Sequence, residues 1–460
     1  MDILKVQKQF KMDIKKIIEE TKGINSEFHY FNTVSEDLAI EESKDSKGKL
    51  KDVIVSVKDC ICVKGIESTA GSAILKGYKP VFDATVIGKA KKEGAIIIGK
   101  TAQDEFGFGS FAVNVGVGFK IPANPFDKER ACGGSSGGAA GFAQKSSFRH
   151  IAIAESTGGS IVAPASFCGI VGLCPTYGRV SRYGLMDYAN SLDKIGPMAK
   201  NVYDAALMLE IIAGFDKNES TSLDVPVDEY TKFIGKDVKG MKIGIIKEAF
   251  GKGVDEEVTA QVKDTIKILE KKGVKAEEVS LPLNFEYSIA CYYLIATAEA
   301  STNLAKYCGM RYGKHEKLEG NFNEYFKDVR SKNFGQEAKR RIMLGTFARM
   351  AGYRDAYYIK AMQLRTKLIE EYKKLFKKYD ALVCPTMPVI APKFSEIEKL
   401  TPLQNYMMDI MTAGPNLAGL PHISVPAGFV KDMPVGIMFI GDHLMEKKII
   451  QLGSAAEVNK

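Results

Sequence analysis

Short apolar runs alternate with stretches of helical spacing from about residue 50 onward. Runs of four to eight apolar residues are typical of buried strands, whereas apolar residues three and four positions apart indicate helices. We expect a helix near residues 86–93 and strands at residues 53–57, 95–98, 151–154, 170–173 and 241–246. Strands that alternate with helices predict an α/β fold around a mainly parallel or mixed sheet.

The first 48 residues have a different pattern. Ile14, Ile17 and Ile18 lie at helical spacing among lysines and glutamates, and a polar loop follows near residues 44–49. This pattern predicts a peripheral helical segment at residues 1–48, formed by a pair of helices, ahead of one main domain at residues 49–460. Because a polar passage precedes residue 226, a second domain boundary near residues 220–240 stays open.

Composition and charge exclude several classes of protein. With 460 residues, of which 45% are hydrophobic, the chain can bury a large core. Its net charge of +8 includes no long basic block, which favours a mildly basic surface over a dedicated nucleic-acid arm. No apolar stretch approaches the roughly 20 residues of a membrane span, and the start of the chain offers no apolar core for a signal peptide.

The eight cysteines are scattered, and the closely spaced pair Cys60 and Cys62 has no second pair at zinc spacing. We therefore expect no metal site, reduced and mostly buried thiols, and a cytoplasmic protein. Residues 94–101 match the phosphate-loop pattern letter for letter. A phosphate cradle needs a flexible loop between its glycines, however, and Ala-Ile-Ile-Ile predicts a strand, so we reject a nucleotide site there.

Two serine clusters lie in glycine-dense backbone, the first at residues 133–138 and the second at residues 156–160. Glycine allows positive φ and close approach of a ligand, so successive N–H groups can converge on an oxyanion. Ser160 directly follows Thr157-Gly158-Gly159 and stands where a nucleophile would share such a nest. The pattern indicates nucleophilic catalysis and leaves the base to be found.

Histidine is the usual base for a serine nucleophile, but only His150 of the five histidines lies near these glycines. It follows Phe148-Arg149 in what reads as a surface turn, so we expect a solvated loop residue. A lysine can replace histidine when burial among uncharged groups lowers its pKa from about 10.4 towards 7. Lys58, at the end of the apolar run 53–57, is the candidate, although a lysine that leaves a strand for solvent fits the same pattern.

These residues resemble the amidase signature family, whose members use a Ser-Ser-Lys triad. The resemblance rests on Lys58-Asp59, both serine clusters, Ala163-Pro164-Ala165 and Phe167-Cys168-Gly169. It implies the amidase signature fold, in which helices cover both faces of a large mixed central β-sheet. By position it makes Ser160 the acyl-forming nucleophile, Lys58 the base and Ser135 the bridging serine.

The resemblance extends to the backbone around the two serine clusters. It implies that Thr157, Gly158 and Gly159 form the oxyanion hole and that the peptide before Ser135 is cis. The segment between the clusters is one residue longer than is usual in the family. Ser136 therefore stays open as the bridging residue.

Two positions depart from the family's pattern. Relatives place an aspartate before Thr-Gly-Gly-Ser and an arginine after Ser-Ile, where this chain has Ser156 and Val162. Loss of both ends of an ion pair is physically coherent, because a single survivor would be an unpaired buried charge. The replacement puts the stiffness of the nucleophile loop in question.

Several later stretches resemble one branch of the family, the A subunits of aspartyl/glutamyl-tRNA amidotransferases, which generate ammonia from glutamine. They lie at residues 175–197, 292–305, 339–358 and 416–421. Free glutamine presents an α-carboxylate and an α-ammonium, so a selective pocket needs one fixed cation and one fixed anion. The resemblance assigns these roles to Arg341, with its bidentate fork, and to Asp409, with Tyr292 or Tyr293 in the wall. Arg340 is adjacent and stays open as the cation.

The same resemblance implies partners. A separate B subunit would bind misacylated tRNA and use ATP and Mg²⁺ to activate its glutamyl or aspartyl group. A small C subunit would wrap this chain, which would hold no cofactor of its own. Two alternatives stay open. A free-standing amidase for other small amides would have no use for Arg341 and Asp409, and a non-catalytic scaffold would explain Ser156 and Val162 as marks of decay.

Overall fold

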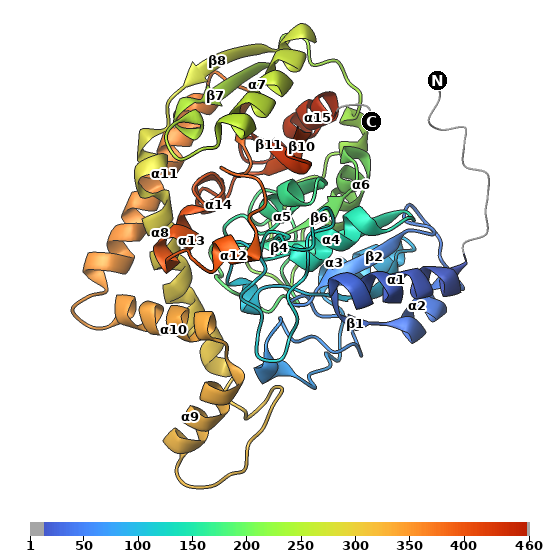
Figure 1. The fold of residues 1–460 in the computed structure, drawn as a ribbon, viewed down its shortest axis with the longest axis vertical. Helices are drawn as coiled ribbons and strands as arrows, with labels where there is room; N and C mark the ends of the chain where they lie inside the picture. The colour runs from blue at the N-terminus through green and yellow to red at the C-terminus, as the bar shows by residue number, and fades with distance from the viewer. Residues whose placement is uncertain (1–12, 458–460) are drawn as a thin grey trace.

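The computed structural model describes residues 13–457, whose strands form one 11-stranded sheet (Figure 1). The order across the sheet is β1-β3-β2-β4-β6-β5-β10-β11-β9-β7-β8. The strands are β1 Phe31–Val34, β2 Ile54–Lys58, β3 Ile96–Thr101, β4 His150–Ser156, β5 Val171–Cys174, β6 Lys194–Ala199, β7 Lys242–Ile246, β8 Lys275–Val279, β9 Ala381–Pro385, β10 His422–Val430 and β11 Met433–Ile440.

The sheet is mixed. Strand β2 pairs parallel with β3 and β4, and β7 pairs parallel with β8 and β9, whereas β6, β5, β10 and β11 link these two blocks through antiparallel pairs. Strands on either side of residues 220–240 therefore belong to one hydrogen-bonded sheet. The five strands expected from the apolar runs are all present, each shifted by one to three residues at an end.

Fifteen α-helices within the described residues surround this sheet. They are α1 Ile14–Phe28, α2 Glu36–Ser43, α3 Thr85–Lys92, α4 Gly137–Lys145, α5 Val162–Phe167, α6 Val202–Ile212, α7 Glu256–Lys271, α8 Pro282–Asn303, α9 Phe322–Asn333, α10 Gln336–Arg349, α11 Lys360–Phe376, α12 Phe394–Ile397, α13 Pro402–Met407, α14 Ala413–Leu417 and α15 Glu446–Ala456. Helices α9 and α10 extend away from the sheet, at the lower left of Figure 1.

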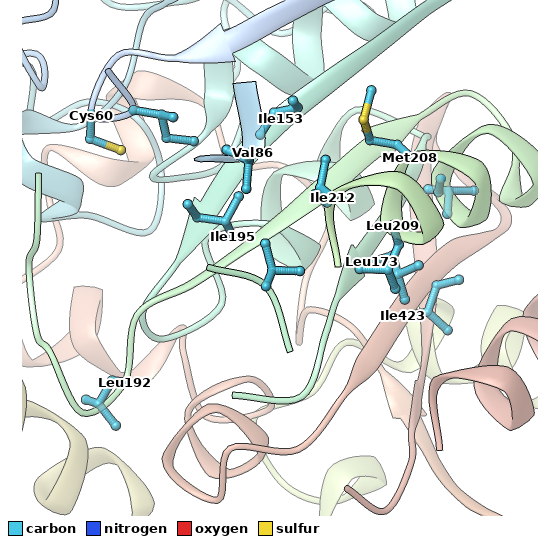
Figure 2. Packing of buried hydrophobic residues seen from close by; sticks show 14 of the residues in the cluster. Cys60, Val86, Ile153, Leu173, Leu192, Ile195, Met208, Leu209, Ile212 and Ile423 are labelled. Carbon is cyan, nitrogen blue, oxygen red and sulfur yellow. The ribbon is translucent and has the colours of Figure 1, made fainter. Parts of the chain in front are cut away.

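Helices bury both faces of the sheet, because side chains along each strand alternate between two hydrophobic clusters. Val55 and Ile153 pack in the cluster that contains residues of α3, α6, α7 and α15, part of which Figure 2 shows. Ile54 and Ala152, one residue earlier on the same strands, pack in the cluster that contains residues of α1, α4 and α5. The expected α/β fold with a large mixed sheet covered on both faces is thus confirmed.

The N-terminal segment contributes more than the predicted helix pair. Residues 1–12 lie outside the described residues, and α1 and α2 follow as expected. Between them, β1 pairs antiparallel with β3 and forms one edge of the sheet. A four-residue strand carries too little periodicity to be recognised in the sequence. The division of the chain at residue 48 stays a prediction.

The structure agrees with the local expectation for residues 94–101 and contradicts the one for His150. Ile96–Thr101 is strand β3, so the rejection of a phosphate loop there agrees with the structure. The expected surface turn at His150 is wrong, because β4 begins at this residue and the side chain is buried. His150 Nε2 lies 2.9 Å from Ser56 Oγ, and burial lowers the pKa of the imidazole to about 3.

Candidate active site

The carboxyl end of β2 brings the predicted base to the first serine cluster, and the end of its parallel neighbour β4 begins the second cluster. Lys58 is the last residue of β2, and β4, its parallel neighbour, ends at Ser156. The Lys58 side chain is completely buried, and its Nζ lies 2.7 Å from Ser135 Oγ. The alternative of a lysine that leaves the strand for solvent is therefore wrong.

The two neighbouring serines have different partners. The peptide between Gly134 and Ser135 is cis, as the family resemblance implied, and Ser135 Oγ contacts Lys58. Ser136 Oγ instead donates a hydrogen bond of 3.2 Å to the backbone carbonyl of Glu155. The geometry thus favours Ser135 over Ser136 as the bridging residue.

The loop that carries Ser160 is tied to its surroundings without the family's ion pair. Ser156 Oγ accepts a 3.2 Å hydrogen bond from Gly159 N–H and lies 3.5 Å from Asn416 Oδ1. Val162 is fully buried in the apolar cluster beside α4. A Cβ atom at Gly159, where φ is +149°, would lie 2.3 Å from Thr412 Oγ1. Close packing and the hydrogen bond between Gly159 and Ser156 therefore hold the loop in place of the missing charges.

The surroundings of Lys58 are not uncharged, contrary to the expectation from sequence. Glu155 Oε2 lies 2.8 Å from Lys58 Nζ, and the Glu155 carbonyl oxygen accepts a second hydrogen bond of 2.9 Å. The other carboxyl oxygen of Glu155 lies 2.7 Å from Thr157 Oγ1, which is also 2.7 Å from Asp193 Oδ1. A buried lysine, two buried carboxyl groups and a threonine hydroxyl thus form one cluster behind Ser135.

A cavity of about 10 Å³ connects the nucleophile loop with the predicted glutamine-binding residues. Its lining combines glycines from two loops with Ser160, two tyrosines of α8, a cation of α10 and the carboxyl group that follows α13. The residues are Gly107, Gly109, Gly158, Gly159, Ser160, Tyr292, Tyr293, Arg341 and Asp409. All four predicted glutamine-binding residues therefore face the same space as Ser160.

Arg341 is held at this cavity by a carboxylate and by aromatic rings. Its Nε donates a 2.8 Å hydrogen bond to Glu337 Oε1, and its Nη1 donates one of 2.6 Å to Tyr188 Oη. The guanidinium carbon lies 5.1 to 5.7 Å from the ring centres of Phe108, Tyr188, Tyr293 and Tyr406. The Arg341 side chain is only 3% exposed, whereas that of Arg340 is 43% exposed. The geometry thus favours Arg341 over Arg340.

Asp409 is fixed by two hydroxyl groups from distant parts of the chain. Ser110 Oγ donates a 2.8 Å hydrogen bond to Oδ1, and Tyr293 Oη donates one of 2.7 Å to Oδ2. Burial raises the pKa of the Asp409 carboxyl group to about 6, which leaves it ionised at neutral pH. Tyr293 also stacks on Tyr406, with ring centres 4.0 Å apart, and so closes the wall of the cavity.

Sequence reasoning missed five residues that orient the predicted ones. They are Ser110, Glu155, Tyr188, Asp193 and Glu337. For Glu155 a signal was available, since it is a charged residue at the end of the apolar run 151–154. For Glu337 the signal was its position four residues before Arg341 on the same helix, α10. The other three reach the site from elements that only the tertiary fold brings near.

No group of three or more His, Cys, Asp or Glu side chains in residues 13–457 is arranged to hold a metal ion. The eight cysteines, all of them described, are unpaired, and all but Cys308 are buried. None of the described helices is both long and apolar enough to cross a membrane.

Comparison with known proteins identifies the family. A family model described as Amidase matches residues 13–450. The chain belongs to the amidase family. Its resemblance to that family, inferred from the serine clusters and Lys58, is thereby confirmed.

Three similar amidase-family proteins share one description, the A subunit of glutamyl-tRNA(Gln) amidotransferase. The chain is 48% identical over 410 residues to the protein from Geobacillus sp. (strain WCH70), covering 89% of this chain and 83% of the relative. It is 44% identical over 473 residues to the one from Alkaliphilus metalliredigens (strain QYMF), covering 99% and 95%. The crystal structure of the protein from Thermotoga maritima superimposes with a TM-score of 0.81 at 39% identity, covering 95% and 89%.

Proposed function

We propose that this chain is the glutaminase subunit of a tRNA-dependent amidotransferase. The observation that carries the proposal is the cavity in which Ser160 faces both Arg341 and Asp409. A buried cation and a buried anion beside a nucleophile match the two charges of free glutamine. A site for simple amides gains nothing from either charge, and relatives described as amidotransferase A subunits support the same choice.

The proposed chemistry is acyl transfer through a serine ester. Neutral Lys58 takes a proton from Ser135, Ser135 takes one from Ser160, and Ser160 Oγ attacks the side-chain amide carbon of glutamine. The C–N bond then breaks, and the amide nitrogen leaves as ammonia with a proton returned by the relay. Water hydrolyses the glutamyl ester by the same route, and glutamate departs. The contact of 2.7 Å between Lys58 and Ser135 supports this relay.

Backbone N–H groups of Thr157, Gly158 and Gly159 would hold the oxyanion. Loss of one such donor typically lowers kcat by about 10²- to 10³-fold. Glycine at position 158 lets the Tyr292 ring pack directly against this backbone, because a Cβ atom there would lie 2.4 Å from the ring. The Gly159 N–H bonds to Ser156 Oγ, so Ser156 would share this donor with the oxyanion.

Glutamine binding in this proposal requires movement of the cavity wall, because about 10 Å³ holds no more than roughly one water molecule. A second cavity of about 490 Å³ shares Gly109 and Arg341 with the first and is also lined by Tyr406. Tyr406 of helix α13 stacks on Tyr293 of helix α8. Separation of these two rings would join the cavities and admit the substrate.

The proposed function includes partners beyond this chain. A B subunit would receive the ammonia, bind misacylated glutamyl- or aspartyl-tRNA, and use ATP and Mg²⁺ to activate the acyl group. A small C subunit would stabilise the assembly. Because misacylated tRNA, ATP and glutamine occur together in the cytoplasm, the proposal places the chain there.

Replacement of Arg341 tests the substrate assignment. Arg341→Ala should lower kcat/KM for glutamine by about tenfold to 100-fold, since a hydrogen bond to a charged group contributes about 1.5–3 kcal/mol. Ammonia release by the purified complex measures the effect. Arg340→Ala removes a neighbouring, exposed charge that pairs with the other carboxyl oxygen of Glu337, so it should change kcat/KM by no more than a few-fold. Full activity of Arg341→Ala on glutamine, or cleavage of uncharged amides alone by the wild type, would contradict the proposal.

Asp409 should make glutamine binding depend on pH. Its carboxylate is present above about pH 6 and is lost as pH falls through that value, so KM for glutamine should rise on acidification. Asp409→Asn should have a high KM at all pH values and lack this rise. Burial also raises the pKa of Asp104 to about 6, and Asp104 remains in the variant. Any pH dependence of KM that comes from Asp104 should therefore persist in Asp409→Asn.

A substrate without an α-ammonium gives the matched control for Asp409. Glutaramic acid keeps the side-chain amide and the carboxylate that Arg341 would bind. Its KM should respond to Arg341→Ala and ignore the ionisation of Asp409. An equal pH dependence of KM for both substrates would show that Asp409 does not contact the ammonium.

A further inference from the structure

The contacts of Lys58 match an ammonium group in number and kind. Its Nζ lies within 2.9 Å of three acceptors, namely Ser135 Oγ, the Glu155 carbonyl oxygen and Glu155 Oε2. An ammonium has three N–H donors and no lone pair, so it would donate to Ser135. In that form Lys58 has no lone pair with which to accept the Ser135 proton.

The hydrogen-bond count around Thr157 indicates that one of two carboxyl groups is protonated. Thr157 Oγ1 lies 2.7 Å from carboxyl oxygens of both Glu155 and Asp193, but it has one hydrogen to donate. One carboxyl group must therefore be protonated and donate to Thr157. Burial and the neighbouring Glu155 raise the pKa of Asp193 well above its usual range. Because Glu155 also contacts Lys58 Nζ at 2.8 Å, we assign the negative charge to Glu155 and the proton to Asp193.

We propose that Glu155 holds Lys58 in the ammonium form, so that this structure is a latent state of the relay. The inference rests on the proposed role of Lys58 as the base. Glu155 is a positioning residue that acts through Lys58, because an opposite charge at 2.8 Å in a buried site favours the charged amine. Catalysis then requires Lys58 to lose its proton, which happens more readily as pH rises or as the pair separates.

The other titratable and charged groups around Lys58 and Glu155 do not cancel the effect of the Glu155 charge on Lys58. Asp104, before the short helix Glu105–Gly107, is ionised above about pH 6 and also favours the ammonium. Burial raises the pKa of the Cys60 and Cys174 thiols, which keeps both uncharged. Lys100 on β3 lies 3.4 Å from Asp59 and is neutralised by it. Lys194 on β6 donates to the carbonyl of Leu420, and burial lowers its pKa.

A fluorophosphonate reports on Lys58 without any need for glutamine. This reagent phosphonylates an activated serine, with formation of an O–P bond, release of fluoride and transfer of the serine proton to the relay. The full-length protein, purified with its associated subunits, is labelled at a series of pH values, and Ser160 modification is measured by peptide mass spectrometry. In the wild type the rate should rise about tenfold per pH unit across neutrality. A rate that is independent of pH between about 6 and 9 would overturn the inference.

Glu155→Gln removes the charge and keeps the shape of the side chain. The pH at which labelling becomes fast should fall by one unit or more, so labelling at pH 7 should be at least several-fold faster than in the wild type. Glu155→Asp keeps a carboxylate and should retain a transition close to that of the wild type. A purely structural role for Glu155 would instead slow labelling at every pH. That result, or an unshifted transition in Glu155→Gln, would contradict the proposal.

The test separates this inference from the glutaminase assignment. Labelling of Ser160 with the expected shift, in a protein that does not hydrolyse glutamine, would support the role of Glu155 and reject the substrate. Glutamine hydrolysis, together with an unshifted labelling transition in Glu155→Gln, would support the glutaminase assignment and reject the role of Glu155. Absence of any labelling at Ser160, in a protein that hydrolyses glutamine, would overturn this inference and leave the substrate assignment standing.

Discussion

Ser160→Ala should abolish ammonia release from glutamine, with kcat lowered by about 10⁴-fold or more. The reason is that no other described hydroxyl group lines the cavity beside Arg341 and Asp409 except the phenols of Tyr292 and Tyr293. Removal of one oxygen from a side chain that is 6% exposed should change the free energy of unfolding by no more than about 1 kcal/mol. The measurement is ammonia production by the purified complex.

Binding of the product glutamate provides the control for this variant, because the wild type does not consume it. Ser160→Ala keeps Arg341 and Asp409, so its Kd for glutamate, measured by calorimetry, should stay close to that of the wild type. Loss of activity with intact binding assigns Ser160 to the chemical step. Activity within tenfold of the wild type would mean that another group attacks the amide.

Lys58→Met should lower kcat by a similar factor, because methionine nearly matches lysine in length and has no amine for the relay. This change also leaves the Glu155 carboxylate buried without its cation, which typically costs about 3–5 kcal/mol. A protein that is inactive because it unfolds would give the same activity result. Thermal unfolding therefore has to accompany the assay.

The double variant Lys58→Met/Glu155→Gln separates catalysis from stability. Glutamine at position 155 removes the unpaired charge, so the double variant should recover most of the lost unfolding free energy. It should remain as inactive as Lys58→Met alone, since the base is still absent. Recovery of activity together with stability would show that Lys58 is structural.

The sequence predicted those parts of the fold and site that depend on local pattern. Apolar runs located five strands, and the apolar run before Lys58 placed this residue at the end of a buried strand. The oxyanion-binding backbone around Ser160 stays a prediction. His150 was misjudged because β4 begins one residue before the apolar run that predicted it. Strand β1 was missed because its four residues are too few to show a strand's periodicity and to be distinguished from a loop.

Contacts between distant residues could not be predicted from pattern. Ser110 and Asp409 are 299 positions apart, and only the tertiary fold brings their oxygens to 2.8 Å. Arg340 and Arg341 are equivalent in the sequence, yet neighbouring helix positions point about 100° apart, and packing against Tyr188 selects Arg341. Glu155 was visible as a charge after an apolar run, but its partner Lys58 lies 97 positions away.

The covalent intermediate tests the central claim most directly. The purified complex is mixed with glutamine, quenched with acid within the first turnover, digested, and analysed by mass spectrometry for a glutamyl ester. The account predicts the ester on Ser160 in the wild type and on no residue in Ser160→Ala. Ammonia release by the wild type without a glutamyl group on Ser160 at any quench time would contradict it.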